Sequence, residues 1–242
     1  MKTKDVAHHI INWLNDYAEE SKLDGFVVGV SGGVDSALTS TLCANTGKPT
    51  LCLEMPINQE KDQVSRANSH TNWLAKNFSN VRVKVVPLDT LYDSFCQLDA
   101  ERNDNTNTPL SLANTRSRLR MATLYYFASQ ERFLVAGTGN KVEDFGVGFY
   151  TKYGDGGVDI SPIADCNKTQ VWELGKELGI LKEIIDAPPT DGLWDDGRTD
   201  EGQLGFKYED LEDAMVNPDS PHKAEYEKIR KQNLHKMEPI PV

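Results

Sequence analysis

Short apolar runs alternate with amphipathic segments along most of the chain. Runs typical of buried strands lie at 26–30 (FVVGV), 50–55 (TLCLEM), 81–88 (VRVKVVPL) and 132–138 (RFLVAGT). Segments with the apolar spacing of helices lie between them, at 34–45, 59–78 and 109–129. Because apolar strands that alternate with helices build parallel sheets buried on both faces, the pattern predicts an α/β fold with helices on both sides of the sheet.

Both ends of the chain add helices to this pattern. Residues 3–20 carry apolar side chains at helical spacing, and further helices are expected near 167–179, 208–216 and 220–233. The segment 188–205 is polar and rich in Gly and Asp. A long irregular loop in a compact domain is usually either a lid or disordered, so this loop is a candidate cover for a site.

The helix expected near 109–129 carries three arginines. Its buried stripe is predicted to comprise Leu112, Thr115, Leu119, Ala122 and Tyr126. At 100° per residue, Arg118 shares a face with Asn114, while Arg116 shares another face with Arg120. Spacing alone leaves open whether these arginines form a solvated basic face or bind phosphate.

Composition narrows the classes of function. The formal net charge is −11, which is unusual for a protein that tracks nucleic-acid phosphates, so we expect no nucleic-acid partner. No apolar run approaches the roughly 18 residues of a membrane helix, and the N-terminus lacks the apolar core of an export signal. The cysteines are scattered, without a CxxC pair, which suits a reducing cytoplasm rather than a zinc cluster or a disulfide framework.

The turn after the first strand has the composition of a phosphate site. Its sequence, SGGVDS at 31–36, places two glycines and two serines between a strand and a helix. Glycine N–H groups, serine hydroxyls and the positive end of the helix together can bind an anion. Asp35 would repel phosphate unless Mg²⁺ lies between them, so the turn predicts a nucleotide and metal site. The alternative is a structural turn with Asp35 at the favourable end of the helix.

The segment GTGNKVED (137–144) follows the fourth strand, at the same edge of the predicted sheet. Glu143 could be a second Mg²⁺ ligand beside Asp35, but from spacing alone an acid at the start of a helix is the better explanation. Farther along, Lys168 opens a helix, where a cation is unfavourable unless an anion lies nearby.

The segment GFYTKYGDGGVDISPI (148–163) gathers Lys152, Asp155 and Asp159 among glycines and two tyrosines. A lysine there can neutralise phosphate, and an aspartate can accept a hydrogen bond from a sugar hydroxyl or an amide. This density of special residues favours a binding loop over a plain turn. By contrast, His235 and Lys236 near the C-terminus have the pattern of a solvated tail.

These motifs resemble a known family. SGGVDS is similar to the pyrophosphate loop of the ATP pyrophosphatase superfamily, whose members split ATP between its α- and β-phosphates. Further pieces resemble, in order, the bacterial ammonia-dependent NAD synthetases. They are NTRSRLRM, GTGNKVED, TKYGDGGVDISP, NKTQV, PPTDGLWDD, TDEGQLGFKYEDLE and HKMEPIP. TKYGDGG and the TDE…LGF segment are far more specific than the loop.

The resemblance implies a Rossmann-like fold of the adenine nucleotide α-hydrolase type, with about five parallel strands. It implies a single synthetase domain over residues 1–242, with no glutaminase domain. The implied reaction is the ATP- and Mg²⁺-dependent amidation of deamido-NAD by ammonia, the last step of NAD biosynthesis. The nicotinate carboxylate would attack the α-phosphorus of ATP and release pyrophosphate, and ammonia would then convert the NAD-adenylate to NAD and AMP.

The resemblance also assigns site residues. Asp35 and Glu143 match the Mg²⁺ ligands, and Asp35, Lys152, Asp155 and Lys168 are the expected catalytic residues. The positions expected at ATP are Gly29, Val30, Ser31, Gly32, Gly33, Val34, Asp35, Ser36, Leu53, Met55, Thr138, Lys168 and Thr190. Those expected at deamido-NAD are Arg118, Lys152, Asp159, His235 and Lys236. Asp155 and the loop 191–205 would close over the nicotinate end. The family further implies a homodimer in the cytoplasm, with the Trp13 helix or residues 112–127 as apolar contact surfaces.

Three other functions share part of this pattern. A tRNA-modifying pyrophosphatase would want a basic face and often reactive cysteines, whereas this chain is acidic. A GMP synthetase would share the SGGVDS loop, but the TKYGDGG segment does not fit it. An ATP-binding sensor without turnover would explain the loop and leave the second cluster at 148–168 unexplained. Ammonia-dependent NAD synthesis is therefore the function that the sequence predicts.

Overall fold

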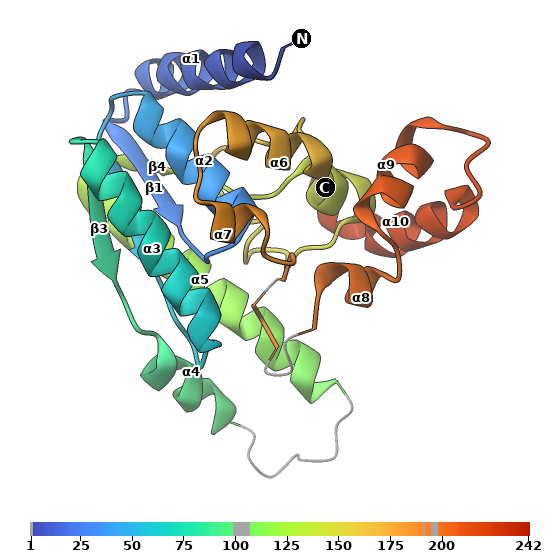
Figure 1. The fold of residues 1–242 in the computed structure, drawn as a ribbon. Coiled ribbons are helices and arrows are strands. Elements are labelled where there is room, and N and C mark those ends of the chain that lie inside the picture. The colour runs from blue at the N-terminus through green and yellow to red at the C-terminus, as the bar shows by residue number, and fades with distance from the viewer. Residues whose placement is uncertain (1, 99–106, 191, 195–197) are drawn as a thin grey trace.

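A parallel sheet of four strands lies at the centre of the protein (Figure 1). The structure is a computed structural model that describes residues 2–98, 107–190, 192–194 and 198–242. The strand order is β3-β2-β1-β4. The strands are β1 Gly25–Gly29, β2 Thr50–Glu54, β3 Val81–Val85 and β4 Phe133–Val135. β2 is buried throughout, because it lies between strands and under helices on both faces, whereas most of the edge strand β3 is exposed.

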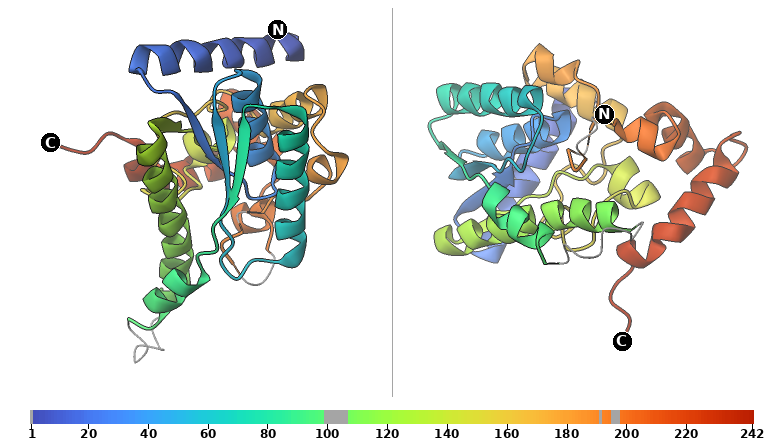
Figure 2. Two further views of the ribbon diagram at one scale, coloured as in Figure 1. Left: turned by 90° about the vertical axis from the view of Figure 1, so that its left-hand side faces the viewer. Right: turned by 90° about the horizontal axis from the view of Figure 1, so that it is seen from below.

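Helices cover both faces of the sheet, and the left-hand view of Figure 2 shows the three layers edge-on. On one face lie α2 (Val34–Asn45) and α3 (Lys61–Asn77). On the other face lies α5 (Thr108–Glu131), which contacts β1, β4 and α4 (Asp89–Cys96). Since every strand is parallel, all four carboxyl ends meet at one edge, where such sheets bind ligands.

Helix α1 (Thr3–Ser21) lies across the opposite, amino end of the sheet (Figure 1). It packs through Ile10, Leu14 and Ala18 against α2 and α6 (Lys168–Glu177), and the short α7 (Lys182–Ile185) joins the same core. The helix therefore closes the core at the end that carries no ligand-binding loops.

Residues 141–147 and 200–237 form a helical lobe beside the sheet, with its own apolar core (Figure 1). Its elements are the π-helix η1 (Lys141–Val147), α8 (Asp200–Leu204), α9 (Tyr208–Val216) and α10 (Lys223–Met237). Its most buried side chains include Val142, Val147 and Leu211. Because η1 also carries Glu143, this lobe positions one of the predicted site residues.

The structure differs from the sequence-based expectations in several elements. The expected fifth strand is reduced to one parallel bridge between Ala136 and Ile160, before Pro162, which has no N–H to continue a ladder. The predicted stripe of α5 was right only in part: Leu112 and Leu119 pack against the core, whereas Tyr126 is 59% exposed, and Ala113, Arg116 and Ser117 are buried. The elements α4, α7 and α8 were not anticipated, while the helix start expected at Glu143 is present as η1. In the described part of the chain, no helix is long and apolar enough to cross a membrane.

Candidate active site

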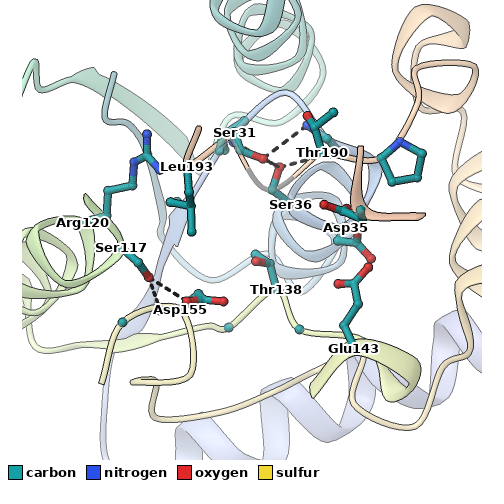
Figure 3. Close-up of a pocket in the computed structure, with 18 of the residues that line it drawn as sticks. Ser31, Asp35, Ser36, Ser117, Arg120, Thr138, Glu143, Asp155, Thr190 and Leu193 are labelled. Atoms are coloured by element: carbon teal, nitrogen blue, oxygen red, sulfur yellow. Dashed lines mark hydrogen bonds between the residues drawn. The ribbon is translucent and has the colours of Figure 1, made fainter. Parts of the chain in front are cut away.

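A pocket opens at the carboxyl ends of the strands, between the loop after β1, the segment after β4, helix α5, residues 187–190 and Leu193 (Figure 3). Of the positions expected at ATP, it is lined by Gly29, Val30, Ser31, Gly33, Val34, Asp35, Ser36, Met55, Thr138, Lys168 and Thr190. Gly32 instead lines a smaller adjoining cavity. Leu53 does not line the pocket, because its side chain is fully buried inside the sheet. The fold thus gathers most of one predicted set in one place.

The phosphate loop, residues 29–36, is held in one shape by its own serines and by α3. The Ser36 hydroxyl donates to the Gly33 carbonyl at 3.0 Å and accepts from the Ser31 amide at 3.1 Å. Gly32 has a φ of +85°, and a Cβ there would lie 2.5 Å from the Gln63 carbonyl oxygen. Glycine is therefore required at this position, while the first-turn N–H groups of α2 remain available to an anion.

The Lys168 ammonium lies between two carboxylates at the pocket wall. Its Nζ is 2.6 Å from Asp35 Oδ2 and 3.0 Å from Glu143 Oε1, and its side chain is only 1% exposed. These residues come from α6, α2 and η1, which are far apart in the sequence. The anion that a lysine at the start of α6 requires is thus supplied by these two acids.

Burial and charge shift the pKa values of this trio. Burial raises the pKa of the Asp35 carboxyl above its ordinary value, although Lys168 opposes the shift. Burial acts in the same direction on Glu143, but Lys168 and a hydrogen bond from Tyr208 outweigh it and leave that pKa lowered. Burial would lower the pKa of Lys168, yet the two carboxylates outweigh it, so the pKa is raised. The Lys168 side chain is therefore a charged ammonium between the two acids.

Three residues that the sequence analysis missed complete this cluster. The Tyr208 hydroxyl donates to Glu143 Oε1 and lies 3.3 Å from Asp200 Oδ2, and the Lys168 ammonium lies 4.8 Å from the centre of the Tyr208 ring. Tyr208 and Asp200 are both buried. Asn140 adds a hydrogen bond of 3.0 Å from its amide to Asp35 Oδ1. Asp200 and Tyr208 lie within TDEGQLGFKYEDLE, the segment that carried the family resemblance, and this was the available signal.

The donor set fits a divalent cation. Asp35 and Glu143 lie beside one another at the pocket wall (Figure 3), and both already bind the same positive group. Carboxylate oxygens are the ligands that Mg²⁺ prefers. The chemistry of these two donors therefore suits Mg²⁺.

A second acidic group lies at the other end of the pocket. Asp155 Oδ1 accepts hydrogen bonds from the Ser117 hydroxyl at 2.6 Å and from the Thr151 amide at 2.9 Å, and the Ser117–Asp155 pair is drawn in Figure 3. Burial first, and then neighbouring carboxylates led by Asp155, raise the pKa of Asp144 well above its ordinary value. Carboxylates gathered in this way favour a cation and can accept a proton.

The arginines of α5 differ in environment. The Arg116 side chain is buried against the Tyr92 ring, and it donates to the Leu193 carbonyl at 2.5 Å. Arg120 lines the pocket and donates to the Met55 carbonyl and to Gln59 Oε1, both at 3.2 Å. Neither arginine belongs to a solvated basic face.

None of the positions expected at deamido-NAD lines the pocket as described. Arg118 donates to the Lys152 carbonyl at 3.3 Å, and the Lys152 ammonium donates to the His235 carbonyl at 2.9 Å. The Lys236 ammonium donates to the Tyr150 carbonyl at 2.8 Å. These four residues therefore form a separate group around the loop 148–153, outside the pocket.

Asp159, the fifth predicted position, is bound by the sheet. Its Oδ2 accepts from the Val135 amide at 2.8 Å, and its Oδ1 accepts from the Tyr125 hydroxyl at 2.9 Å. The carboxylate thus binds the last residue of β4 and links this strand to α5. This is a structural use that the sequence analysis did not anticipate.

The candidate lid contributes to the pocket through its first residues. Ala187, Pro188, Pro189, Thr190 and Leu193 are lining residues, and the Gln63 amide donates to Thr190 Oγ1 at 2.5 Å. Within the expected closing loop 191–205, residues 191 and 195–197 lie outside the described part of the chain. At its end, residues 200–204 form α8, and Asp200 lines the pocket.

The comparisons with known proteins agree with this geometry. The family model described as NAD synthase matches residues 6–239. The chain belongs to the NAD synthase family. An NH(3)-dependent NAD(+) synthetase of Carboxydothermus hydrogenoformans is 38% identical over 214 residues, which are 88% of this chain and 85% of that protein. The synthetase of the same name from Syntrophomonas wolfei is 36% identical, covering 99% of this chain and 96% of its own.

Solved structures of the family have the same fold. The structure of NMN synthetase from Francisella tularensis superposes with a TM-score of 0.88 and 31% identity, covering 100% of this chain and 98% of that one. The NH3-dependent NAD synthetase of Campylobacter jejuni, in complex with nitrate, superposes with a TM-score of 0.79 at 24% identity, covering 100% and 99% of the two chains. At that lower identity the likeness concerns the fold alone. The expected α/β fold of the adenine nucleotide α-hydrolase type is confirmed.

Proposed function

We propose that the protein amidates deamido-NAD with ammonia at the expense of ATP, giving NAD, AMP and pyrophosphate. One observation carries this proposal: a phosphate loop and a separate acidic group face each other across a single pocket, in a chain of the NAD synthase family. The relatives from Carboxydothermus and Syntrophomonas are named NH(3)-dependent NAD(+) synthetases. The loop suits the triphosphate, and the acids suit ammonium.

In the first step, a carboxylate oxygen of the nicotinate attacks the α-phosphorus of ATP. The bond from this phosphorus to the bridging oxygen breaks, and its electron pair leaves with pyrophosphate. The N–H groups of the phosphate loop stabilise the leaving oxygens, and the fixed loop costs no reorganisation during the reaction. Lys168 offsets charge at the α-phosphate side of the loop, where it is already held by Asp35 and Glu143.

In the second step, the nitrogen lone pair of ammonia attacks the activated carbonyl carbon, and the C–O bond to AMP breaks. Ammonia is mostly ammonium near neutral pH, so a site that attracts the cation and removes one proton raises its effective supply. We assign this role to Asp155, which lines the pocket and is oriented by Ser117 and Thr151. Residues 187–190 and Leu193 line the same pocket and would limit the access of water, which competes for the adenylate.

Mg²⁺ is proposed as the metal of this site. Asp35 and Glu143 would hold it, and when bound it would neutralise the charge of the nucleotide phosphates. Asn140 and Tyr208, which bind these two carboxylates, would keep them oriented for it.

A second candidate substrate is nicotinic acid mononucleotide, whose amidation gives NMN. It is favoured by the Francisella structure, which is titled an NMN synthetase and aligns over the whole of this chain. It is favoured also by the position of Arg118, Lys152, His235 and Lys236, which lie outside the pocket of a single chain. A mononucleotide would need fewer of these contacts than a dinucleotide does.

The deciding experiment measures product from ATP and Mg²⁺ with either acceptor, once with ammonium chloride and once with glutamine. NAD from deamido-NAD with ammonium only is the expected result. NMN formed at a higher kcat/KM than NAD would establish the second candidate. ATP binding without either product would contradict both and favour a sensor.

Assembly and location complete the proposal. We propose that residues 1–242 act as one synthetase domain supplied with free ammonia. We propose a homodimer through the outer face of α4 and α5, where Leu91, Phe95, Leu110 and Tyr126 are each 46–59% exposed. A cytoplasmic location is supported by the cysteines, all of which are free thiols.

A further inference from the structure

A small cavity adjoins the phosphate loop on the side that faces α3. It is lined by Ser31, Gly32, Gly33, Gln59, Gln63, Arg66, Ala187, Pro188, Thr190 and Gly192. Ser31, Gly33, Pro188 and Thr190 also line the main pocket, so the two spaces meet at the phosphate loop. A nucleotide whose phosphates follow the loop would therefore have a place for the end of its triphosphate here.

Arg66 is the cation of this small cavity. It lies on α3 and is half-buried, and its Nε donates to the Gly32 carbonyl at 3.3 Å. This bond directs the guanidinium to the outer side of the glycine turn. Among the described residues, none accepts a hydrogen bond from the two terminal nitrogens of Arg66. A planar guanidinium fork beside a glycine turn matches two oxygens of a phosphate.

The other cations near the loop are already engaged. Lys168 is shared between two carboxylates. Arg120 is bound to the Met55 carbonyl and to Gln59. The donors of the loop itself are N–H groups and hydroxyls. In addition to the proposed Mg²⁺, the charge on the β- and γ-phosphates therefore calls for a further cation, and Arg66 is placed to supply it.

We propose that Arg66 binds the β- and γ-phosphates of ATP, and then the pyrophosphate, at a subsite between the phosphate loop and α3. This inference rests on the proposed function, since it concerns the same reaction. When the carboxylate–phosphorus bond forms and the bridging P–O bond breaks, the added negative charge falls on the pyrophosphate. Arg66 neutralises that charge from the side opposite Lys168, and it makes no contact with the α-phosphate.

The test compares the affinities of three ligands, measured calorimetrically with Mg²⁺: ATP, inorganic pyrophosphate and AMP. In Arg66→Gln, the dissociation constants for ATP and pyrophosphate should rise about tenfold, as expected for loss of a charge-assisted hydrogen bond, while that for AMP should stay within about twofold. Arg66→Lys should recover part of the loss by restoring the charge. Lys76→Gln, an exposed residue of the same helix, is the matched control and should change none of the three.

The outcomes separate this inference from the proposed function. If the wild-type protein forms NAD or NMN and Arg66→Gln binds ATP with unchanged affinity, only the inference about Arg66 fails. If Arg66→Gln loses ATP and AMP affinity equally, the residue merely shapes the glycine turn, and the inference also fails. A wild-type protein that binds no ATP would overturn the proposed function together with it. Thermal unfolding of each variant confirms that the compared proteins are folded.

Discussion

Tyr208 shows how a residue without conspicuous chemistry can control a charged site. It is buried in the core of the C-terminal lobe, yet its hydroxyl donates to Glu143 and its ring lies under the Lys168 ammonium. A buried carboxylate that loses a hydrogen-bond donor keeps its desolvation cost. The hydroxyl therefore orients Glu143 without touching the substrate.

Tyr208→Phe removes this donor and keeps the ring. We expect kcat to fall about tenfold and the Mg²⁺ concentration for half-maximal rate to rise severalfold, with a loss of stability of about 1–2 kcal/mol. Steady-state kinetics over a Mg²⁺ titration and urea unfolding measure these effects. Tyr226→Phe, a buried tyrosine of the same core away from the acids, should leave the Mg²⁺ dependence unchanged. An unaltered Mg²⁺ dependence in Tyr208→Phe would contradict the positioning role.

His70 makes stability depend on pH. It is fully buried beside Ser40, and burial lowers its pKa from 6.5 to about 4. Above pH 6.5 both folded and unfolded states hold it neutral; as the pH falls toward 4, only the unfolded state gains the proton. Stability should therefore fall by up to about 3 kcal/mol across this window. Urea unfolding at several pH values measures the slope, which should flatten in His70→Gln.

At the scale of elements, the loop 148–158 depends on α5 for its position. Ser117 both donates to Asp155 Oδ1 and accepts from the Asp155 amide at 2.8 Å, and Thr151 donates to Asn114 at 2.7 Å. A Cβ on Gly154 would lie 2.2 Å from Ser117 Oγ, so the loop can approach the helix only as glycine. The helix thus sets the place of the acidic end of the pocket.

Ser117→Ala should loosen Asp155 without touching the phosphate loop. We expect the KM for ammonium to rise about fivefold, while the KM for ATP changes less than about twofold, because one hydrogen bond to a charged group is lost. Asp155→Asn should affect the ammonium KM more strongly. Ser111→Ala, on the exposed side of the same helix, serves as the control. Equal effects on both KM values would indicate a general structural defect instead.

Apolar periodicity predicted most helices and strands, because it reflects directly which side chains are buried. Each of the four predicted strands and most helices are present, with ends shifted by a few residues. The face of α5 that was predicted to be buried was only partly right, for a physical reason. Its buried side includes Arg116 and Ser117, polar residues that bind the candidate lid and the loop 148–158 respectively. A pattern of apolar residues cannot reveal a face that is buried for polar contacts.

The same limit applies to the site. The motif after β1 predicted the phosphate loop, because parallel sheets bind ligands at the carboxyl ends of their strands. The pairing of Asp35 with Glu143 was implied by the family resemblance, since spacing alone favoured a helix-start acid at Glu143. The contact of Lys168 with both acids was not derivable from spacing, since it joins three elements. Tyr208 is one of eight tyrosines, and only tertiary structure distinguishes it. The fold was likewise needed to recognise the separate group formed by Arg118, Lys152, His235 and Lys236.

At the scale of the whole molecule, exposed apolar side chains support the proposed homodimer. Helices α4 and α5 carry Leu91, Phe95, Leu110 and Tyr126, each 46–59% exposed, although the protein carries a net charge of −11. Exposed apolar side chains on adjacent helices of an acidic protein favour association. We expect a dimer mass by light scattering after gel filtration, and a shift to monomer in Leu91→Lys/Tyr126→Lys. Val216→Lys, at a more exposed apolar residue on the C-terminal lobe, should leave the dimer intact.

The Lys168 ammonium has one further consequence, for how the protein tolerates metal starvation. A pair of buried acids normally depends on a captured ion to offset its repulsion, and such proteins lose stability in a chelator. Here the counter-ion is covalently part of the chain and cannot be stripped away. EDTA should therefore abolish turnover yet leave the melting temperature unchanged. Such an enzyme should stay folded when magnesium is scarce and should regain activity as soon as the ion is restored.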